Sequence, residues 1–187
     1  MLFNIKLYFV LFFILFFGKI ECFNASNFRI INTNSLKQNL NHNNGSYTYS
    51  QKKYKNGKLK LEIWLINNSP EKYVKGYYEN GNLKYQGWIK NGWKENYWKF
   101  YHENGILKLE GRYVNNKKYY WWINYEANGN KLSEGQYDNG IKHGFFNYYK
   151  NGLIIVDGKF EDGKKIGHWN IYDDAGKIKK IVQFTKE

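Results

Sequence analysis

The chain has 187 residues, a formal net charge of +13 and an aromatic content of 20%, with a single cysteine and a single proline. One cysteine excludes a disulfide framework within the chain. The positive charge favours acidic or anionic partners, although charge alone does not distinguish a binding surface from a merely soluble one.

The N-terminal segment has the pattern of a signal peptide. Residues 1–6 carry one positive charge, and residues 7–17 form an unbroken apolar run. Such a run suits a signal-peptide core and is too short for an ordinary membrane-spanning helix, which needs ~20 residues. We therefore predict a hydrophobic signal helix within a signal peptide at 1–22, and export to the periplasm, the cell surface or the medium. An uncleaved membrane anchor and lipidation of Cys22 stay open as alternatives.

The next segment, residues 23–50, is rich in asparagine and shows no convincing period. A composition of this kind buries little apolar surface, so we predict a disordered tether. A short extra strand over residues 28–31 stays open.

Residues 51–187 form a tandem repeat of 23 to 24 residues, with about five and a half copies. A fixed period of this length indicates a repeat architecture. An Asn-Gly pair or a near equivalent marks the copies at Gly57, Gly81, Gly105, Gly129, Gly152 and Gly176. Counted from these glycines, three columns recur: a second glycine at 87, 111, 135 and 158, an aromatic or apolar residue at 74, 98, 122, 146 and 169, and a tyrosine at 77, 101, 125, 149 and 172.

The repeat predicts two short strands and two tight turns per unit. Asn-Gly between alternating apolar residues is the strongest local signal for a two-residue hairpin turn, because both residues tolerate positive φ. A helix is excluded, since Gly and Asn interrupt the pattern every ten to fourteen residues. We therefore expect an all-β fold, an elongated single-layer antiparallel β-meander of hairpin repeats. A fixed mid-strand glycine marks close approach of another group, so we predict that the Trp98, Trp122 and Trp169 rings lie over the glycines of neighbouring strands.

The run YENGNLKYQG, followed by a turn and then Trp and Tyr, resembles the MORN repeat and in particular the bacterial variant of the YwqK-like antitoxin family. The copies at residues 128–151 and 161–172 carry the resemblance best, and it extends over residues 54–184. The first copy departs at Ile63 and Pro70, and the third at Tyr120 and Trp121, so these copies are candidates for distorted or capping units. The resemblance implies a non-catalytic protein that binds and neutralises a toxin.

No arrangement of residues predicts catalysis or a metal site. The carboxylates Glu62, Glu110, Glu134 and Asp157 all occupy the column five residues after the glycine, which favours an architectural role. The histidines His102, His143 and His168 fall in three different columns without metal-ligand spacing. We therefore expect neither enzyme activity nor a cofactor.

Two surfaces are predicted to bind partners. Aromatic residues that exceed the needs of the core predict a partner-binding patch of Trp88, Trp93, Tyr97, Tyr119 and Trp121. Lysines near the second turn of successive copies predict a basic edge of Lys90, Lys94, Lys117, Lys118, Lys142, Lys164 and Lys165. Solubility of exposed turns and packing onto an adjacent hairpin are the competing structural interpretations of these residues.

Two functions follow from these surfaces. The first is a protein-interaction scaffold with a toxin as the implied partner. The second is an exported envelope module that binds an anionic membrane surface, an envelope polymer or a glycan. Nucleic acid is not expected for an exported chain, and self-association stays open because a meander leaves edge strands.

Overall fold

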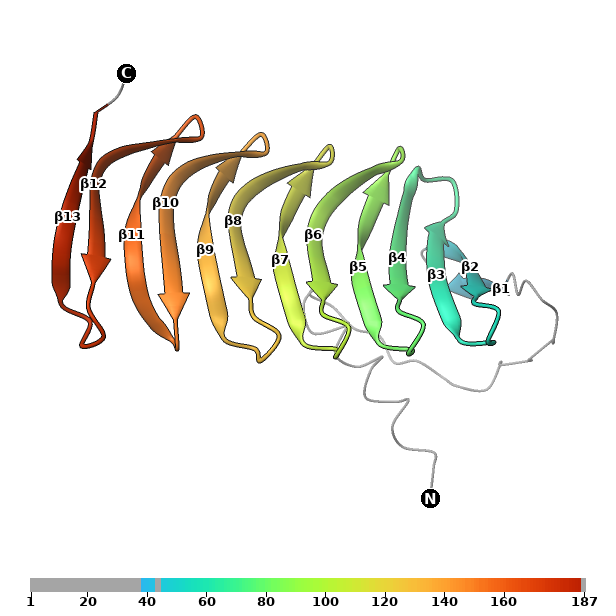
Figure 1. Cartoon of the computed structure of the whole chain (residues 1–187). Coiled ribbons are helices and arrows are strands. Elements are labelled where there is room, and N and C mark those ends of the chain that lie inside the picture. Colours follow the sequence, from blue (N-terminus) through green and yellow to red (C-terminus); the bar gives the residue numbers. More distant parts are fainter. Residues whose placement is uncertain (1–37, 43–44, 186–187) are drawn as a thin grey trace. The chain divides into compact units, whose positions relative to one another are not determined.

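The computed structural model describes residues 38–42 and 45–185, and all of them belong to one of the two units of the chain, residues 33–187. These residues form a single open sheet of 13 antiparallel strands, in which sequence order and spatial order coincide (Figure 1). The predicted all-β meander is therefore confirmed. The described part contains no helix long and apolar enough to span a membrane. The predicted signal helix and the strand considered at 28–31 lie outside the described residues.

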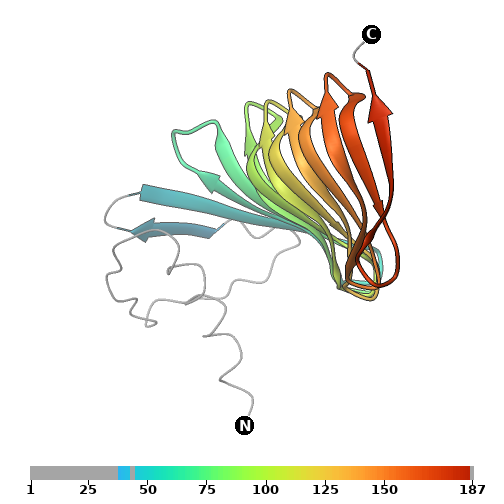
Figure 2. The ribbon, with the colours of Figure 1, turned by 90° about the vertical axis from the view of Figure 1, so that its left-hand side faces the viewer.

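The strands have the following bounds: β1 (Gln38–His42), β2 (Gly45–Lys53), β3 (Leu59–Ile66), β4 (Glu71–Tyr77), β5 (Leu83–Lys90), β6 (Trp93–Tyr101), β7 (Leu107–Val114), β8 (Lys117–Tyr125), β9 (Lys131–Asp138), β10 (Ile141–Lys150), β11 (Leu153–Glu161), β12 (Lys164–Tyr172) and β13 (Ile178–Phe184). Seen along the stack, the strands are curved and the sheet twists between its two ends (Figure 2), as sheets of L-residues do.

The turns are of two kinds. The turn between β5 and β6 has two residues, Asn91 and Gly92, with φ of 52° and 84°, as a type I′ turn requires. The turn between β4 and β5 spans residues 78–82, in which the Gly81 N–H donates to the Tyr78 carbonyl at 3.0 Å. The prediction of a two-residue turn is thus correct for the first kind and wrong for the second.

The single 23-residue spacing has a local explanation. Between β10 and β11 the connection shortens to two residues, Asn151 and Gly152, both with positive φ. Tyr149 pairs with Ile154 across this turn, with four residues between them, whereas in the preceding repeat Tyr125 pairs with Lys131, with five residues between them. The missing residue of that repeat is therefore lost in the turn, so the strand register is preserved.

The mid-strand glycines accommodate aromatic rings, as predicted. A Cβ placed on Gly87 would lie within 3.0 Å of the Trp98 ring, and a Cβ on Gly111 would meet the Trp122 ring in the same way. The rings are almost completely buried, with Trp98 exposed by 2% and Trp122 by 0%. Phe146 and Trp169 cover the glycines of β9 and β11 equally closely. The aromatic column therefore forms the core of this single-layer sheet.

The sheet extends further towards the N-terminus than the repeat count predicts. The predicted domain start at Gln51 falls inside β2, and β1 pairs with β2 upstream of it. Tyr49 explains why β2 joins the array: its ring packs on Trp64 at a centroid distance of 5.3 Å, and its hydroxyl donates to Glu62 at 2.6 Å. Part of the Asn-rich segment thus belongs to the sheet.

Candidate binding surfaces

The two faces of the sheet differ in composition. One face, which we name the core face, carries Trp98 and Trp122 over the glycines. The other, which we name the aromatic face, is defined by the strand register: Tyr97 and Tyr119 both lie opposite Arg112, and Trp121 lies opposite Gln136. Directly opposed residues of an antiparallel pair share a face, so these side chains project from the same side.

The aromatic face brings together all five residues of the predicted patch. Trp93 is 51% exposed, Tyr97 50% and Trp121 44%, whereas Trp88 and Tyr119 are half-buried against neighbours. The sequence analysis missed Phe145, which is 60% exposed on the same face. The signal was present, because Tyr73, Tyr97, Trp121 and Phe145 occupy one column of four consecutive repeats.

Aromatic rings continue along this face towards the N-terminal strands. The rings of Tyr49, Trp64, Tyr73 and Trp88 follow one another on β2 to β5, with successive centroid distances of 5.3, 5.9 and 5.2 Å. The aromatic column of the later repeats lies on alternate strands, β6, β8 and β10, so its rings recur about every 10 Å. The aromatic side chains of this face thus lie on seven of the nine strands from β2 to β10, since the tyrosines of β7 and β9 pack on the core face.

A β-bulge shapes this face in four repeats. Asn96, Tyr120, Gly144 and Gly167 occupy the same column and all have positive φ, between 58° and 94°. The register shifts beside each of them, so the strand carries extra residues opposite the glycine. The bulge interrupts the backbone hydrogen bonds between the two strands. The indole N–H of Trp98 donates to the Trp88 carbonyl there, at 3.0 Å. The bulge therefore makes room for the aromatic ring to fold over the glycine.

Tyr120 is the least expected residue in this column. Its φ is 60°, a value that bulky side chains rarely adopt. Its ring is 62% exposed and lies 5.8 Å from the Arg112 guanidinium. The third copy therefore keeps the bulge geometry of its neighbours although a tyrosine replaces the usual glycine.

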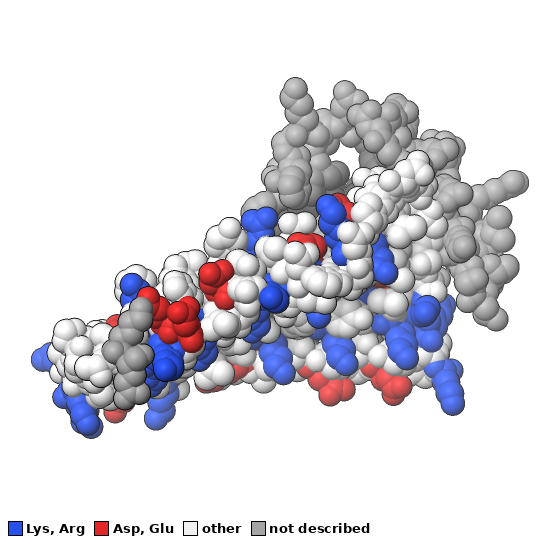
Figure 3. All heavy atoms as spheres, turned by 90° about the horizontal axis from the view of Figure 1, so that it is seen from above, with Lys and Arg blue, Asp and Glu red and all other residues white. Residues whose placement is uncertain are grey.

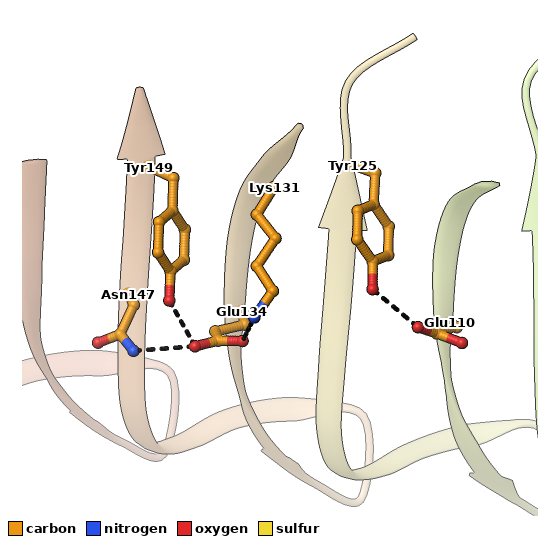
Figure 4. A network of polar contacts seen from close by, with 6 residues as sticks. All are labelled: Glu110, Tyr125, Lys131, Glu134, Asn147 and Tyr149. Carbon is orange, nitrogen blue, oxygen red and sulfur yellow. Dashed lines mark hydrogen bonds and ion pairs between the residues drawn. The ribbon is translucent and has the colours of Figure 1, made fainter. Parts of the chain in front are cut away.

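The carboxylate column has structural partners. The Tyr125 hydroxyl donates to Glu110 at 2.8 Å, and the Tyr149 hydroxyl donates to Glu134 at 2.5 Å (Figure 4). The same relation recurs between Tyr172 and Asp157, at 2.6 Å, and between Tyr77 and Glu62. Each carboxylate thus bonds the tyrosine fifteen residues later, which supports an architectural role for both columns.

Glu134 is the most densely bonded of these carboxylates. Besides Tyr149, it accepts hydrogen bonds from Lys131 at 2.9 Å and from Asn147 at 3.2 Å (Figure 4). Partial burial raises the pKa of Glu134, but the hydrogen bonds from these three side chains outweigh burial, and the net pKa lies below its usual range. On the same face, burial and then the Glu110 charge raise the pKa of Tyr97 to about 12.

Lysines of one column cover the rings of the core face. Lys118 Nζ lies 4.5 Å from the Trp122 ring centroid and 4.9 Å from that of Tyr137, and Lys165 Nζ lies 4.3 Å from the centroid of Trp169. Lys94 and Lys142 make the equivalent contacts in their repeats. We name these four residues, Lys94, Lys118, Lys142 and Lys165, the lysine ladder.

The structure divides the predicted basic edge between the two faces. Lys94, Lys118, Lys142 and Lys165 belong to the core face, whereas Lys90, Lys117 and Lys164 lie opposite residues of the aromatic face. Lys90 is paired with Glu71 at 2.9 Å. Viewed from the side of the two-residue turns, basic side chains recur along the sheet with acidic side chains among them (Figure 3).

The histidines stay apart from one another. His102 Nε2 donates to the Tyr125 carbonyl at 3.0 Å, and His143 Nδ1 lies 3.8 Å from Asp162. Within residues 38–42 and 45–185, no group of three or more His, Cys, Asp or Glu side chains could hold a metal ion.

These features define a class of protein: a tandem β-hairpin repeat with a single-layer sheet whose two faces differ in composition. The sequence comparisons agree, since residues 70–91 and 94–115 match the family described as MORN repeat variant. The chain therefore contains MORN-variant repeats in two adjacent copies. A comparison with curated proteins gives no match.

Solved structures give partial likenesses. A mutant of S. aureus TarM in complex with fondaparinux, alpha-GlcNAc-glycerol and UDP shares 11% identity over 59% of this chain, with a TM-score of 0.34. A second TarM crystal structure shares 10% identity over 71% of this chain, with a TM-score of 0.32. The chain covers 21% of each of these proteins, about a fifth of their length.

Proposed function

We propose that this protein is a non-catalytic scaffold that binds a protein partner through the aromatic face of its sheet. The observation that carries the proposal is the column formed by Tyr97, Trp121 and Phe145, which are 50%, 44% and 60% exposed on one face. Exposed apolar patches of this kind mark interaction sites. Tyr and Trp are also the residues that contribute most to the affinity of protein interfaces.

The architecture supports a passive role for the remaining conspicuous side chains. The carboxylates bond tyrosines of the next strand, and the core tryptophans are buried over glycines. These groups hold the repeats together, so the exposed rings are the side chains left available for a ligand.

The sequence resemblance to YwqK-like antitoxins makes a toxin the first partner to test. We further propose that the chain is exported, so the partner would act in the same compartment. A glycan competes for the same surface, because planar rings also accept sugars.

The test is partner capture followed by reconstitution. The full-length chain is crosslinked in its host, the captured protein is identified, and binding is then measured with both purified proteins. Trp121→Ser with Phe145→Ser should weaken binding at least tenfold. The matched control is Ile178→Ser with Ile181→Ser, which removes two side chains of similar exposure, 53% and 54%, from β13.

The outcomes separate the alternatives. Loss of binding in the aromatic pair alone supports the proposal, and suppression of the toxicity of the captured partner identifies an antitoxin. Equal binding by both variants would overturn the assignment of the aromatic face. Binding of oligosaccharides in place of any protein would replace the protein partner with a glycan.

A further inference from the structure

The lysine ladder is held at a regular spacing by the backbone. The Asn116 N–H donates to the Lys94 carbonyl at 3.0 Å, and the Gly140 N–H donates to the Lys118 carbonyl at 2.9 Å. The Gly163 N–H repeats the bond to the Lys142 carbonyl at 2.9 Å. Three of the four ladder lysines are thereby tied to the turn of the following repeat, and successive lysines lie two strands, about 10 Å, apart.

The ammonium groups are positioned before any ligand arrives. Each lies over two or more rings, within 5.6 Å of their centroids, as Lys142 does over Phe146, Tyr148 and Phe160. A free lysine side chain loses rotamer freedom when it binds a ligand, and a side chain that is already restrained loses less. The ladder is therefore a preorganised row of positive charge.

This row is not neutralised by carboxylates of the protein. In the described ranges, none of the ion pairs within 4.0 Å includes a ladder lysine, although Lys90, Lys99 and Lys131 are paired. Burial, and then the charge of Lys142, lower the pKa of Lys118. An anion placed between two ladder lysines would relieve this repulsion.

The surroundings of the lysine ladder indicate which kind of anion can reach its ammonium groups. Lys94, Lys118 and Lys142 are half-buried against the sheet, so a narrow chain reaches their ammonium groups more readily than a flat surface does. Of the rings beneath them, Trp98, Trp122 and Trp169 are exposed by 2% or less, and Tyr113, Tyr137 and Tyr148 are half-buried, so none is fully exposed. Single-stranded nucleic acids bind by stacking their bases on exposed rings, and this face offers none under the lysines.

We propose that the lysine ladder binds a linear polyphosphate chain that runs across the strands. Phosphate oxygens would accept hydrogen bonds from successive ammonium groups while the rings hold the lysine stems in place. This site lies on the face opposite to the proposed protein-binding surface, so the failure of one proposal would leave the other unaffected. At the N-terminal end of the ladder, a hollow of ≈ 520 Å³ is bordered by Lys94 and Lys72 and lined otherwise mostly by apolar side chains such as Ile89.

The test measures binding of inorganic polyphosphate to the full-length chain by fluorescence anisotropy. The ladder variant carries Lys94→Gln, Lys118→Gln, Lys142→Gln and Lys165→Gln. The matched control variant carries Lys52→Gln, Lys108→Gln, Lys150→Gln and Lys179→Gln, four exposed lysines outside the ladder. Both variants lose the same net charge, so a difference between them reports position rather than total charge.

The ladder variant should bind at least tenfold more weakly than the control variant. For the native chain, four phosphate contacts predict that the logarithm of the affinity falls with the logarithm of the salt concentration with a slope of roughly 3. A variant with four Lys→Arg changes at the ladder should keep its binding, and thermal unfolding monitored by circular dichroism establishes that every variant is folded.

Three results would overturn the proposal. The first is equal weakening in the ladder and control variants, which would mean that net charge alone attracts the polymer. The second is stronger binding to phosphatidylserine vesicles than to polyphosphate, which would make the ligand a membrane surface. The third is a single lysine variant, Lys142→Gln, that folds normally and retains full affinity and the full salt slope.

Discussion

Trp98 lies over Gly87 so closely that a Cβ on the glycine would overlap its ring. The first repeat replaces this pair with Ile63 and Val74, which face each other across β3 and β4. The first repeat thus has two medium-sized side chains at these positions, whereas other repeats have a large aromatic ring and a glycine. We infer that the two side chains together must fill a similar volume, whereas the size of each one alone can vary.

Gly87→Ile and Trp98→Val should therefore be coupled. The first change forces overlap with the ring and should cost about 1–3 kcal/mol of unfolding free energy. The second removes a buried indole and should cost about 3 kcal/mol. The double variant reproduces the first repeat, so its loss should be at least about 1 kcal/mol smaller than the sum of the two. Urea unfolding of the four proteins measures the coupling, and strictly additive losses would contradict it.

The period of the sequence was sufficient to predict this pairing, because a glycine and a tryptophan recurred at fixed separation. It was also sufficient to predict which residues of β5 share a face, since Tyr85 and Gly87 contact Trp98 while Gln86 bonds Tyr101. The patch of Trp93, Tyr97 and Trp121 was gathered on one face for the same reason. Residues at the same position of successive repeats lie beside one another in a meander. A fixed period is therefore enough to predict which residues form a row across the sheet.

The same reasoning failed where local geometry changes the direction of side chains. Lys117 and Lys118 are neighbours in sequence, but strand alternation places them on opposite faces, so one predicted edge became two rows. The bulge at Asn96 and Tyr120 was not predicted either, because tyrosine is not typical of positive φ and a single asparagine within a strand pattern does not by itself indicate a bulge. Whether a strand carries extra residues opposite a glycine depends on contacts between strands. The spacing of residues along the sequence does not predict such contacts.

Tyr120 should be unfavourable for stability at its position. Its φ of 60° costs an L-residue about 1 kcal/mol, whereas asparagine tolerates this region, as Asn96 does in the same column. Tyr120→Asn should therefore raise the unfolding free energy by up to about 1 kcal/mol. Tyr119→Asn, which changes a half-buried residue next to it, serves as the control and should lower it. Urea unfolding tests both, and a destabilised Tyr120→Asn variant would show that the ring itself contributes to the fold.

Glu134 should make stability dependent on pH. Its pKa is lowered in the folded protein, so its contribution is fully present above the unfolded value of 4.5 and is lost as the pH falls through the folded value. Glu134→Gln should cost about 1 kcal/mol at neutral pH, because a charge-assisted hydrogen bond from Tyr149 is weakened. The difference between the two proteins should shrink in acid below pH 4.5.

Chemical unfolding across this pH range provides the measurement. Glu103→Gln, an exposed change in the five-residue turn after β6, is the control and should show little pH dependence relative to the native chain. A difference between native and Glu134→Gln proteins that grows on acidification would mean that the pKa is raised rather than lowered.

His102 should serve the fold rather than any chemistry. Its ring donates to the Tyr125 carbonyl at 3.0 Å. The tyrosines one and two repeats earlier make the equivalent bond: the Tyr78 hydroxyl donates to the Tyr101 carbonyl at 2.9 Å, and the Tyr54 hydroxyl to the Tyr77 carbonyl at 2.7 Å. In these three repeats the column therefore holds a planar side chain with a donor at its tip, whereas later repeats carry Glu126, Lys150 and Asp173 there.

His102→Tyr should consequently retain the native unfolding free energy, whereas His102→Phe, which keeps a ring but lacks the donor, should lose about 1 kcal/mol. Partner binding through the aromatic face should be unchanged in both variants, because His102 lies in the five-residue turn after β6. Thermal unfolding and the reconstituted binding assay measure the two quantities. A His102→Tyr variant that is as stable as the native chain but no longer binds would assign this histidine a functional role.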